Sequence, residues 1–224
     1  MSLHHNPRIV TSGLVLALDA GDVNSYPGSG TTWYDVSGNG YSATLVNSPT
    51  VSSQGIILDG TNDYITLGHS GNLGFSSSNF TVCVWHKNLS SSTDYNGIIT
   101  NDGASDNAWK IFRDSGQAFY KARSGATTLA FANYTVNRFH MYSYTLSGGN
   151  MQLYLDATPG SSTTGAATPT TQNTIAFGSY RYNDALSLYY LTNQVIGPTF
   201  LYNRALSASE IEQNYQAQKS RFGL

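Results

Sequence analysis

Hydrophobic and polar residues alternate along most of this chain, in short runs separated by clusters of glycine, serine, asparagine and aspartate. The clearest alternation runs from Phe139 to Leu146, and a second run, from Met151 to Asp156, follows after Ser147-Gly148-Gly149-Asn150. Alternation of period two places successive side chains on opposite faces of a strand, and a glycine-rich link between two such runs is typical of a hairpin. The pattern therefore predicts a β-hairpin within an all-β protein.

The same criteria predict roughly thirteen strands at short and fairly even intervals, which suits two stacked antiparallel sheets. We expect these strands at Leu14–Asp19, Ala43–Val46, Gly55–Leu58, Tyr64–Leu67, Phe80–Lys87, Gly97–Thr100, Trp109–Arg113, Ala118–Ala122, Thr128–Ala132, Arg138–Leu146, Met151–Asp156, Thr174–Ser179 and Gln194–Leu201. The stretch from Pro159 to Thr171 consists of small, polar and turn-forming residues, so we expect an exposed loop there.

The end of the chain carries the one strong helix signal. Ser207 can accept a hydrogen bond from the backbone N–H of Glu210, and Glu210 can bond back to the N–H of Ser207, which is a capping box. Leu206 and Ile211 stand where a hydrophobic staple would pack. These signals predict one short C-terminal helix after the last strand.

The order of three N-terminal motifs and this tail resembles a known family. The motifs are Gly13–Ala20, Tyr26–Gly40 and Leu58–Ile65, and together with the tail they resemble the laminin G-like domains, of concanavalin A-like fold, that are common in structural proteins of tailed bacteriophages. The resemblance implies a two-sheet antiparallel jelly-roll sandwich. We expect residues 1–8 to form an N-terminal arm and residues 9–224 to form a single domain.

Composition and charge exclude several classes of partner. Charged residues make up 11% of the chain, the net charge is −2, and the 11 Lys and Arg residues are thinly spread, so we expect no nucleic-acid or membrane binding. The longest apolar run, Leu14 to Leu18, is too short to cross a bilayer, and the first residues lack the pattern of a signal peptide. We therefore expect synthesis in the host cytoplasm. Cys83, the only cysteine, is expected to be buried.

The carboxylates argue against catalysis. The two glutamates, Glu210 and Glu212, both fall in the predicted helix, where residues two apart point away from each other, so no glycosidase pair is apparent. Asp102 and Asp106 are expected to form turns. The five histidines, at positions 4, 5, 69, 86 and 140, do not have metal-ligand spacing. The sequence thus predicts no catalytic residues and no enzyme.

Calcium is the one cofactor that the sequence leaves open. Asp59, Asn62 and Asp63 offer the oxygen ligands that calcium prefers, although the same spacing suits a tight turn around Gly60. Asp19, Asp22 and Asp35 form a second acidic group near the first motif, Gly13–Ala20, and could likewise bind calcium or form turns.

Several aromatic side chains lie in polar surroundings, where a ring with a polar edge can serve a protein interface or stack on a sugar. The candidate ligand or interface residues are Trp33, Tyr34, Tyr180, Tyr182, Tyr189 and Tyr190.

The resemblance favours a non-catalytic phage virion protein that decorates the capsid or forms part of the tail or a fibre. Its partners would be capsid or tail subunits, or further copies of the chain, and its location would be the virion. The first alternative is a carbohydrate-binding adhesin that recognises host-surface glycans, and the second is a glycan hydrolase. Fold alone does not decide among them.

Overall fold

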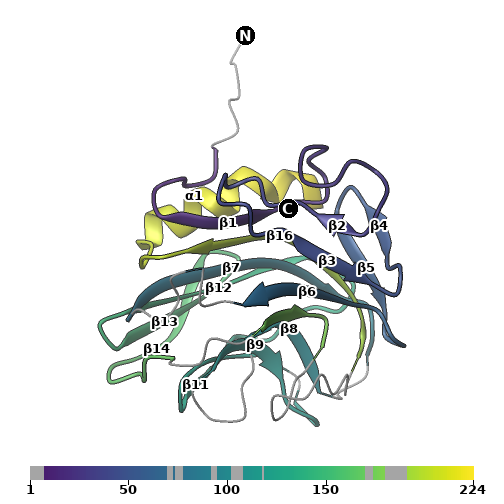
Figure 1. Ribbon diagram of the computed structural model, residues 1–224. Helices are drawn as coiled ribbons and strands as arrows, with labels where there is room; N and C mark the ends of the chain where they lie inside the picture. Colours follow the sequence, from purple (N-terminus) through teal and green to yellow (C-terminus); the bar gives the residue numbers. More distant parts are fainter. Residues whose placement is uncertain are drawn as a thin grey trace.

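The structure, a computed structural model, describes residues 8–69, 73, 78–91, 95–101, 108–117, 119–169, 174–179 and 191–224. Within these residues it contains two eight-stranded antiparallel sheets and one α-helix near the C-terminus (Figure 1). The predicted all-β, two-sheet jelly roll with a short C-terminal helix is therefore confirmed.

The first sheet follows the order β14-β13-β12-β7-β16-β5-β4, with β1 added beside β16. Its strands are β1 (Leu14–Leu18), β4 (Thr50–Ser52), β5 (Gly55–Asp59), β7 (Asn79–Asn88), β12 (His140–Ser147), β13 (Asn150–Leu155), β14 (Thr158–Thr163) and β16 (Asn193–Tyr202). One edge of β16 is shared, because Asn193 to Ile196 pair with β5 while Thr199 to Tyr202 pair with β1.

The second sheet follows the order β11-β10-β9-β8-β15-β6-β3-β2. Its strands are β2 (Thr32–Trp33), β3 (Ala43–Val46), β6 (Tyr64–His69), β8 (Asn96–Asn101), β9 (Trp109–Arg113), β10 (Lys121–Ser124), β11 (Thr127–Ala130) and β15 (Thr174–Phe177). The short strands β2 and β4 were not predicted, and the strand expected at Ala118–Ala122 is displaced to β10.

The hairpin of β12 and β13 forms as predicted. Ser147 pairs with Asn150, and the register continues to Tyr142 opposite Leu155. The two turn residues between the strands, Gly148 and Gly149, have φ angles of 54° and 84°, which a turn of this kind requires and glycine adopts without strain.

The loop expected from Pro159 to Thr171 is partly wrong. Residues Thr158 to Thr163 form β14, an edge strand that pairs with β13. Backbone pairing needs no apolar side chains, and an edge strand tolerates Pro159, which lacks an N–H. The side chains of β14 are nonetheless exposed, as the composition indicated.

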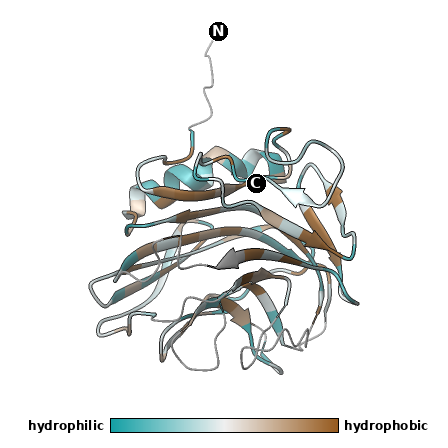
Figure 2. Ribbon diagram, in the orientation of Figure 1, coloured by the Kyte–Doolittle hydropathy of each residue, from teal (hydrophilic) through white to brown (hydrophobic). Residues whose placement is uncertain are grey.

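The main hydrophobic core lies between the sheets. Large rings fill it: Phe80 of the first sheet meets Trp109 of the second, and Trp33 packs beside Phe177 within the second sheet, with ring centroids 6.3 Å apart in each pair. Figure 2 shows hydrophobic colouring along the strands and a largely hydrophilic α1. Interdigitation of these rings fills the space between the sheets.

The C-terminal helix α1 (Ala208–Gln218) begins as the sequence predicts, and a 3-10 turn, η2 (Lys219–Phe222), follows it. The N–H of Glu210 donates to Oγ of Ser207 at 3.3 Å, and the N–H of Ser207 donates to Oε2 of Glu210 at 2.9 Å. Leu206 and Ile211 are buried in one cluster, as expected for the staple.

Both helical segments cover the outer face of the first sheet. The rings of Trp85 and Tyr215 stack with centroids 5.5 Å apart, and Phe222 lies 4.5 Å from Trp85 and 4.2 Å from Phe139. Cys83 is buried in the same cluster, as predicted, and burial raises the pKa of its thiol to about 11. Such a thiol is unreactive near neutral pH.

Side-chain hydrogen bonds attach the start of the described chain to α1 and to the end of β16. Val10 N–H donates to Oδ1 of Asn214 at 2.8 Å, and the hydroxyl of Tyr202 donates to the carbonyl of Val10 at 3.0 Å. The carbonyl of Arg8 accepts from Gln213 at 2.7 Å. The predicted arm therefore has its last residue held by the helix, and its residues 1–7 lie outside the described part of the chain.

Candidate functional site

A surface groove of about 350 Å³ lies between the loop that follows β1 and the turn that joins β4 to β5. Its lining residues are Ala20, Gly21, Val23, Tyr26, Pro27, Gly28, Val51, Ser52 and Ser53. The volume stands at the lower end of the roughly 300–1,000 Å³ typical of small-molecule sites. The lining combines one aromatic ring and short aliphatic groups with serine and backbone polar atoms. This composition suits a small ligand that has both apolar and hydroxyl-bearing faces.

The C-terminal Arg221 fixes the two walls of the groove together. Its Nη1 lies 2.6 Å from Oδ1 of Asp19, and its Nη2 donates to the carbonyl of Ser53. A Cβ atom at Gly21 would lie 2.6 Å from that same carbonyl, so only glycine permits this close approach. The groove is therefore assembled from three distant parts of the sequence.

Capping interactions within the loop hold its backbone. Oδ1 of Asp22 accepts from the N–H of Asn24 at 2.9 Å, and Oδ1 of Asp19 accepts from the N–H of Gly21 at 2.9 Å. Oγ of Ser25 accepts from the N–H of Asp19 at 3.0 Å and donates to the carbonyl of Tyr34 at 2.6 Å. These bonds make the groove a largely preformed site.

The carboxylate of Asp35 accepts several hydrogen bonds that organise the segment following β2. Its carboxylate accepts from the N–H groups of Ala17, Ser37 and Tyr41 at 2.9, 2.9 and 3.1 Å, and from the hydroxyl of Ser37 at 2.8 Å. The Asn39 side chain donates to the carbonyl of Val15 at 3.2 Å. These bonds hold the segment from Asp35 to Tyr41 against β1. The Asp35 carboxylate therefore has a structural role rather than a metal-binding one.

The predicted aromatic site residues differ in their exposure to solvent. Trp33 is fully buried in the core, so the prediction that it contacts a ligand or partner is wrong. Its ring packs in the hydrophobic cluster between the sheets. Tyr34 is 45% exposed, and its N–H donates to the carbonyl of Ser25 at 2.7 Å, next to Tyr26. The remaining candidates, Tyr180, Tyr182, Tyr189 and Tyr190, lie outside the described residues.

The groove ring, Tyr26, was not among the predicted site residues. Its hydroxyl donates to the carbonyl of Gly30 at 3.1 Å, and its ring packs partly against the core. A sequence signal was available, because Tyr26 begins the Tyr-Pro-Gly-Ser-Gly segment, in which turn residues hold a single ring at the surface.

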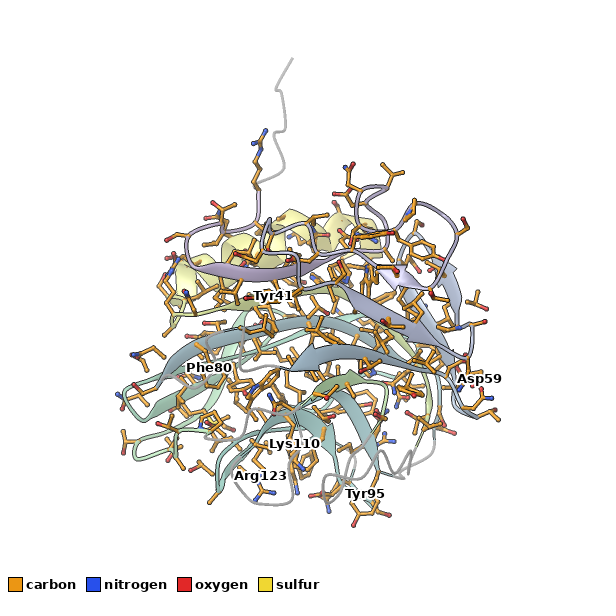
Figure 3. All side chains as sticks on the ribbon, in the orientation of Figure 1. Tyr41, Asp59, Phe80, Tyr95, Lys110 and Arg123 are labelled. Atoms are coloured by element: carbon orange, nitrogen blue, oxygen red, sulfur yellow. The ribbon has the colours of Figure 1, made fainter. Side chains whose placement is uncertain are left out.

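The calcium candidates form a turn. Oδ1 of Asp59 accepts from the N–H groups of Thr61 and Asn62 at 2.7 and 3.3 Å, and the Asp59 N–H donates to Oδ2 of Asp63 at 3.4 Å. Gly60 has a φ of 80°, as the turn requires. Among the described residues, no group of three or more acidic, histidine or cysteine side chains is arranged to hold a metal ion. Asp59 lies at one edge of the molecule, as Figure 3 shows.

The two carboxyls of this turn have opposite pKa directions. The N–H of Thr61 lowers the pKa of Asp59, whereas burial and the charge of Asp59 raise the pKa of Asp63. Split pKa values can mark an acid and a base in catalysis. Here a hydrogen bond from the turn backbone accounts for the lowered pKa of Asp59, and burial beside a second carboxylate accounts for the raised pKa of Asp63.

A buried polar cluster lies between the sheets, away from the groove residues. Nε2 of His86 lies 2.9 Å from Oε1 of Gln194, and Nδ2 of Asn96 donates to the hydroxyl of Tyr120 at 2.9 Å. Arg113, which is also buried, donates to the hydroxyl of Tyr134 at 2.5 Å. Burial lowers the pKa of His86 to about 3, so this imidazole is neutral at physiological pH. These groups position the strands rather than face solvent.

The outer face of the second sheet carries a small basic group. Lys110 on β9 stands opposite Arg123 on β10, and both are labelled in Figure 3. Lys121, next along the same face, pairs with Asp114 at 2.7 Å, and the ammonium of Lys110 lies 4.8 Å from the ring centroid of Phe112. Cations are thus present on the molecule, but on another surface than the groove.

A comparison with models of protein families identifies the family to which this fold belongs. Residues 59–212 match the laminin G family model described as the concanavalin A-like lectin/glucanases superfamily. The chain belongs to this superfamily. The match covers more than half of its length, and it confirms the resemblance as far as the family is concerned, while the bacteriophage context is not part of the finding.

Solved structures show the same fold in larger proteins. A Trypanosoma rangeli sialidase in complex with sialic acid is similar to this concanavalin A-like chain with a TM-score of 0.73 and 19% identity, over 94% of this chain and 34% of that one. The receptor binding domain of a botulinum neurotoxin C/D mosaic serotype is similar with a TM-score of 0.72 and 18% identity, over 93% of this chain and 52% of that one. The chain therefore spans about a third to a half of these proteins.

The sialidase similarity corrects one prediction. We excluded an enzyme because both glutamates lie in α1, yet another Trypanosoma rangeli sialidase structure, a covalent intermediate with 2,3-difluorosialic acid, contains this fold with a TM-score of 0.73 and 18% identity, over 94% of this chain and 34% of that one. The exclusion is therefore wrong. A concanavalin A-like unit of this kind can belong to a glycan-processing protein, so the number of glutamates it carries does not exclude enzymatic function.

A search of curated protein sequences found no match. Within the part of the chain that the structure covers, no helix is long and apolar enough to span a membrane.

Proposed function

We propose that this chain binds carbohydrate, and that the groove beside Tyr26 is the binding site. The observation that carries the proposal is the groove itself, in which an aromatic ring and the aliphatic groups of Val23 and Pro27 lie opposite Ser52 and Ser53. Sugars present apolar C–H faces that stack on such rings and hydroxyl edges that bond polar groups. The superfamily and the sialidase complex with sialic acid support the same reading.

The exposure of the groove residues agrees with this role. Val23 is 72% exposed, and Tyr34 is exposed close by, so apolar groups remain accessible at the rim of a preformed loop. A rigid loop loses little entropy when a ligand binds. A single shallow groove would bind weakly, with a Kd of about 1 mM, equivalent to about −4 kcal/mol. Display of several copies would raise the overall strength of attachment.

The virion assignment remains a prediction. It rests on the resemblance of the terminal motifs to phage structural proteins. Capsid or tail partners, self-association and synthesis in a host cytoplasm are predictions that depend on it. A virion subunit that binds host-surface glycans would satisfy both readings. The binding proposal also suits a unit within a longer glycan-processing enzyme, because it concerns recognition alone.

A glycan array followed by NMR titration tests the proposal. We expect selective binding of the folded chain, with the largest chemical-shift changes at residues 20–28 and 51–53. Val23→Asp should weaken binding because it removes the apolar contact of the exposed wall, while Val136→Asp, at another exposed valine outside the groove, should leave binding unchanged. Absence of binding across the array, or equal loss in both variants, would contradict the proposal.

A further inference from the structure

We infer that the groove accepts a neutral sugar rather than an acidic one such as a sialic acid. The inference rests on the proposed function and names the class of glycan. Its basis is the distribution of charge around the groove, since no lysine or arginine is among the lining residues that the structure describes. A sugar carboxylate that enters a site must exchange its hydration for a cation or for several N–H donors.

Arg221 is the guanidinium that reaches the groove walls, and its charge is already compensated. It forms an ion pair with Asp19 at 2.6 Å, with both side chains largely buried, and its Nη2 is bonded to the carbonyl of Ser53. If Arg221 turned toward a ligand, the bridge between the two walls would break and Asp19 would lose its partner. The site therefore offers no available cation at this position.

A negative charge lies in the loop itself. Asp22 stands between the lining residues Gly21 and Val23. Its Oδ1 accepts from the N–H and the side-chain amide of Asn24 at 2.9 and 3.0 Å, and no ion pair to Asp22 occurs among the residues that the structure describes. The pair of Asp19 and Arg221 is neutral in sum, so the loop contributes a net charge of −1. Like charges at close range select against an acidic ligand.

The cations of the second sheet lie elsewhere. Arg123, which is partly exposed, lies on β10 opposite the buried Lys110 of β9, and neither residue belongs to the groove lining. A sialylated glycan attracted to this chain would therefore meet a countercharge, such as Arg123, on a different surface. The two surfaces can be separated by mutation.

The test compares one oligosaccharide with and without a terminal sialic acid, using NMR titration of the whole chain at low salt. We expect the neutral form to bind in the groove about tenfold more tightly, and the difference to shrink at 0.5 M salt because screening weakens the repulsion. Val23→Lys should gain affinity for the sialylated form, whereas the matched Val136→Lys variant should not. Circular dichroism of each variant checks its fold.

Each outcome has a distinct meaning. Preference for the neutral form, reversed or reduced in Val23→Lys, supports the inference. Equal or tighter binding of the sialylated form in the groove overturns it and leaves the proposed function intact. Sialylated binding that is lost in Arg123→Gln and unaffected in Val23→Asp overturns both, as does absence of any binding.

Discussion

The guanidinium of Arg204 and the carboxylate of Glu210 form two hydrogen bonds, Nη1 to Oε2 at 2.9 Å and Nη2 to Oε1 at 2.5 Å. Glu210 also accepts from the N–H of Ser207 and so completes the capping box of α1. One carboxylate therefore fixes the start of the helix and joins it to the end of β16. The bond to Arg204 and the cap lower the pKa of Glu210 to about 2.

Replacement of Glu210 by Gln should lower the free energy of unfolding at pH 7 by about 1 kcal/mol, as expected for a cap and a partly exposed ion pair. Because the folded-state pKa is depressed, this stabilisation is present above pH 4.5 and is lost as pH falls toward 2. Urea denaturation at pH 7 and pH 3 measures it. Glu212→Gln, on the exposed side of α1, is the control, and an equal loss in both variants would contradict the assignment.

His86 should make the fold sensitive to acid in a different range. Its folded-state pKa of about 3 lies below the ordinary value of 6.5, so the unfolded chain binds the proton first as pH falls. The wild-type chain should lose up to about 1.4 kcal/mol per pH unit from this group below pH 6.5. Denaturation between pH 6.5 and 4.5 should show a shallower decline in His86→Asn. Parallel curves for the two proteins would refute this role of His86.

The buried amide of Asn214 should be important for attachment of the N-terminal segment. It accepts from the N–H of Val10 and donates to the hydroxyl of Tyr202 at 3.0 Å. Asn214→Ala leaves both groups without this partner, so we expect a loss of about 2 kcal/mol and faster hydrogen exchange at the Val10 amide. Glu212→Ala, at an exposed helix position, should change the stability little. Unchanged exchange at Val10 in Asn214→Ala would be inconsistent with the network.

The turn at Asp59 should not depend on calcium. Asp59→Ala removes the acceptor for the N–H groups of Thr61 and Asn62 and should lower the Tm. Millimolar calcium should leave the Tm of the wild-type chain unchanged, since the carboxylates bond to their own turn. A calcium-dependent rise in Tm that disappears in Asp63→Asn would show that this turn is a metal site.

The comparison of sequence with structure shows which signals are local. The capping box at Ser207 and the hairpin at Gly148 and Gly149 depend on residues close in sequence, and both were predicted correctly. Trp33 was misjudged because polar neighbours in sequence do not reveal that alternate residues of β2 point inward. The groove could not be predicted, because Arg221 joins two loops that are distant along the chain.

The most direct test of the account is a crystal structure of the chain soaked with the neutral glycan that binds best. The account predicts sugar density in the groove, with a pyranose face against the ring of Tyr26 and hydroxyls near Ser52 and Ser53. Density confined to another surface, such as the outer face of β9 and β10, or an empty groove at saturating ligand, would contradict it.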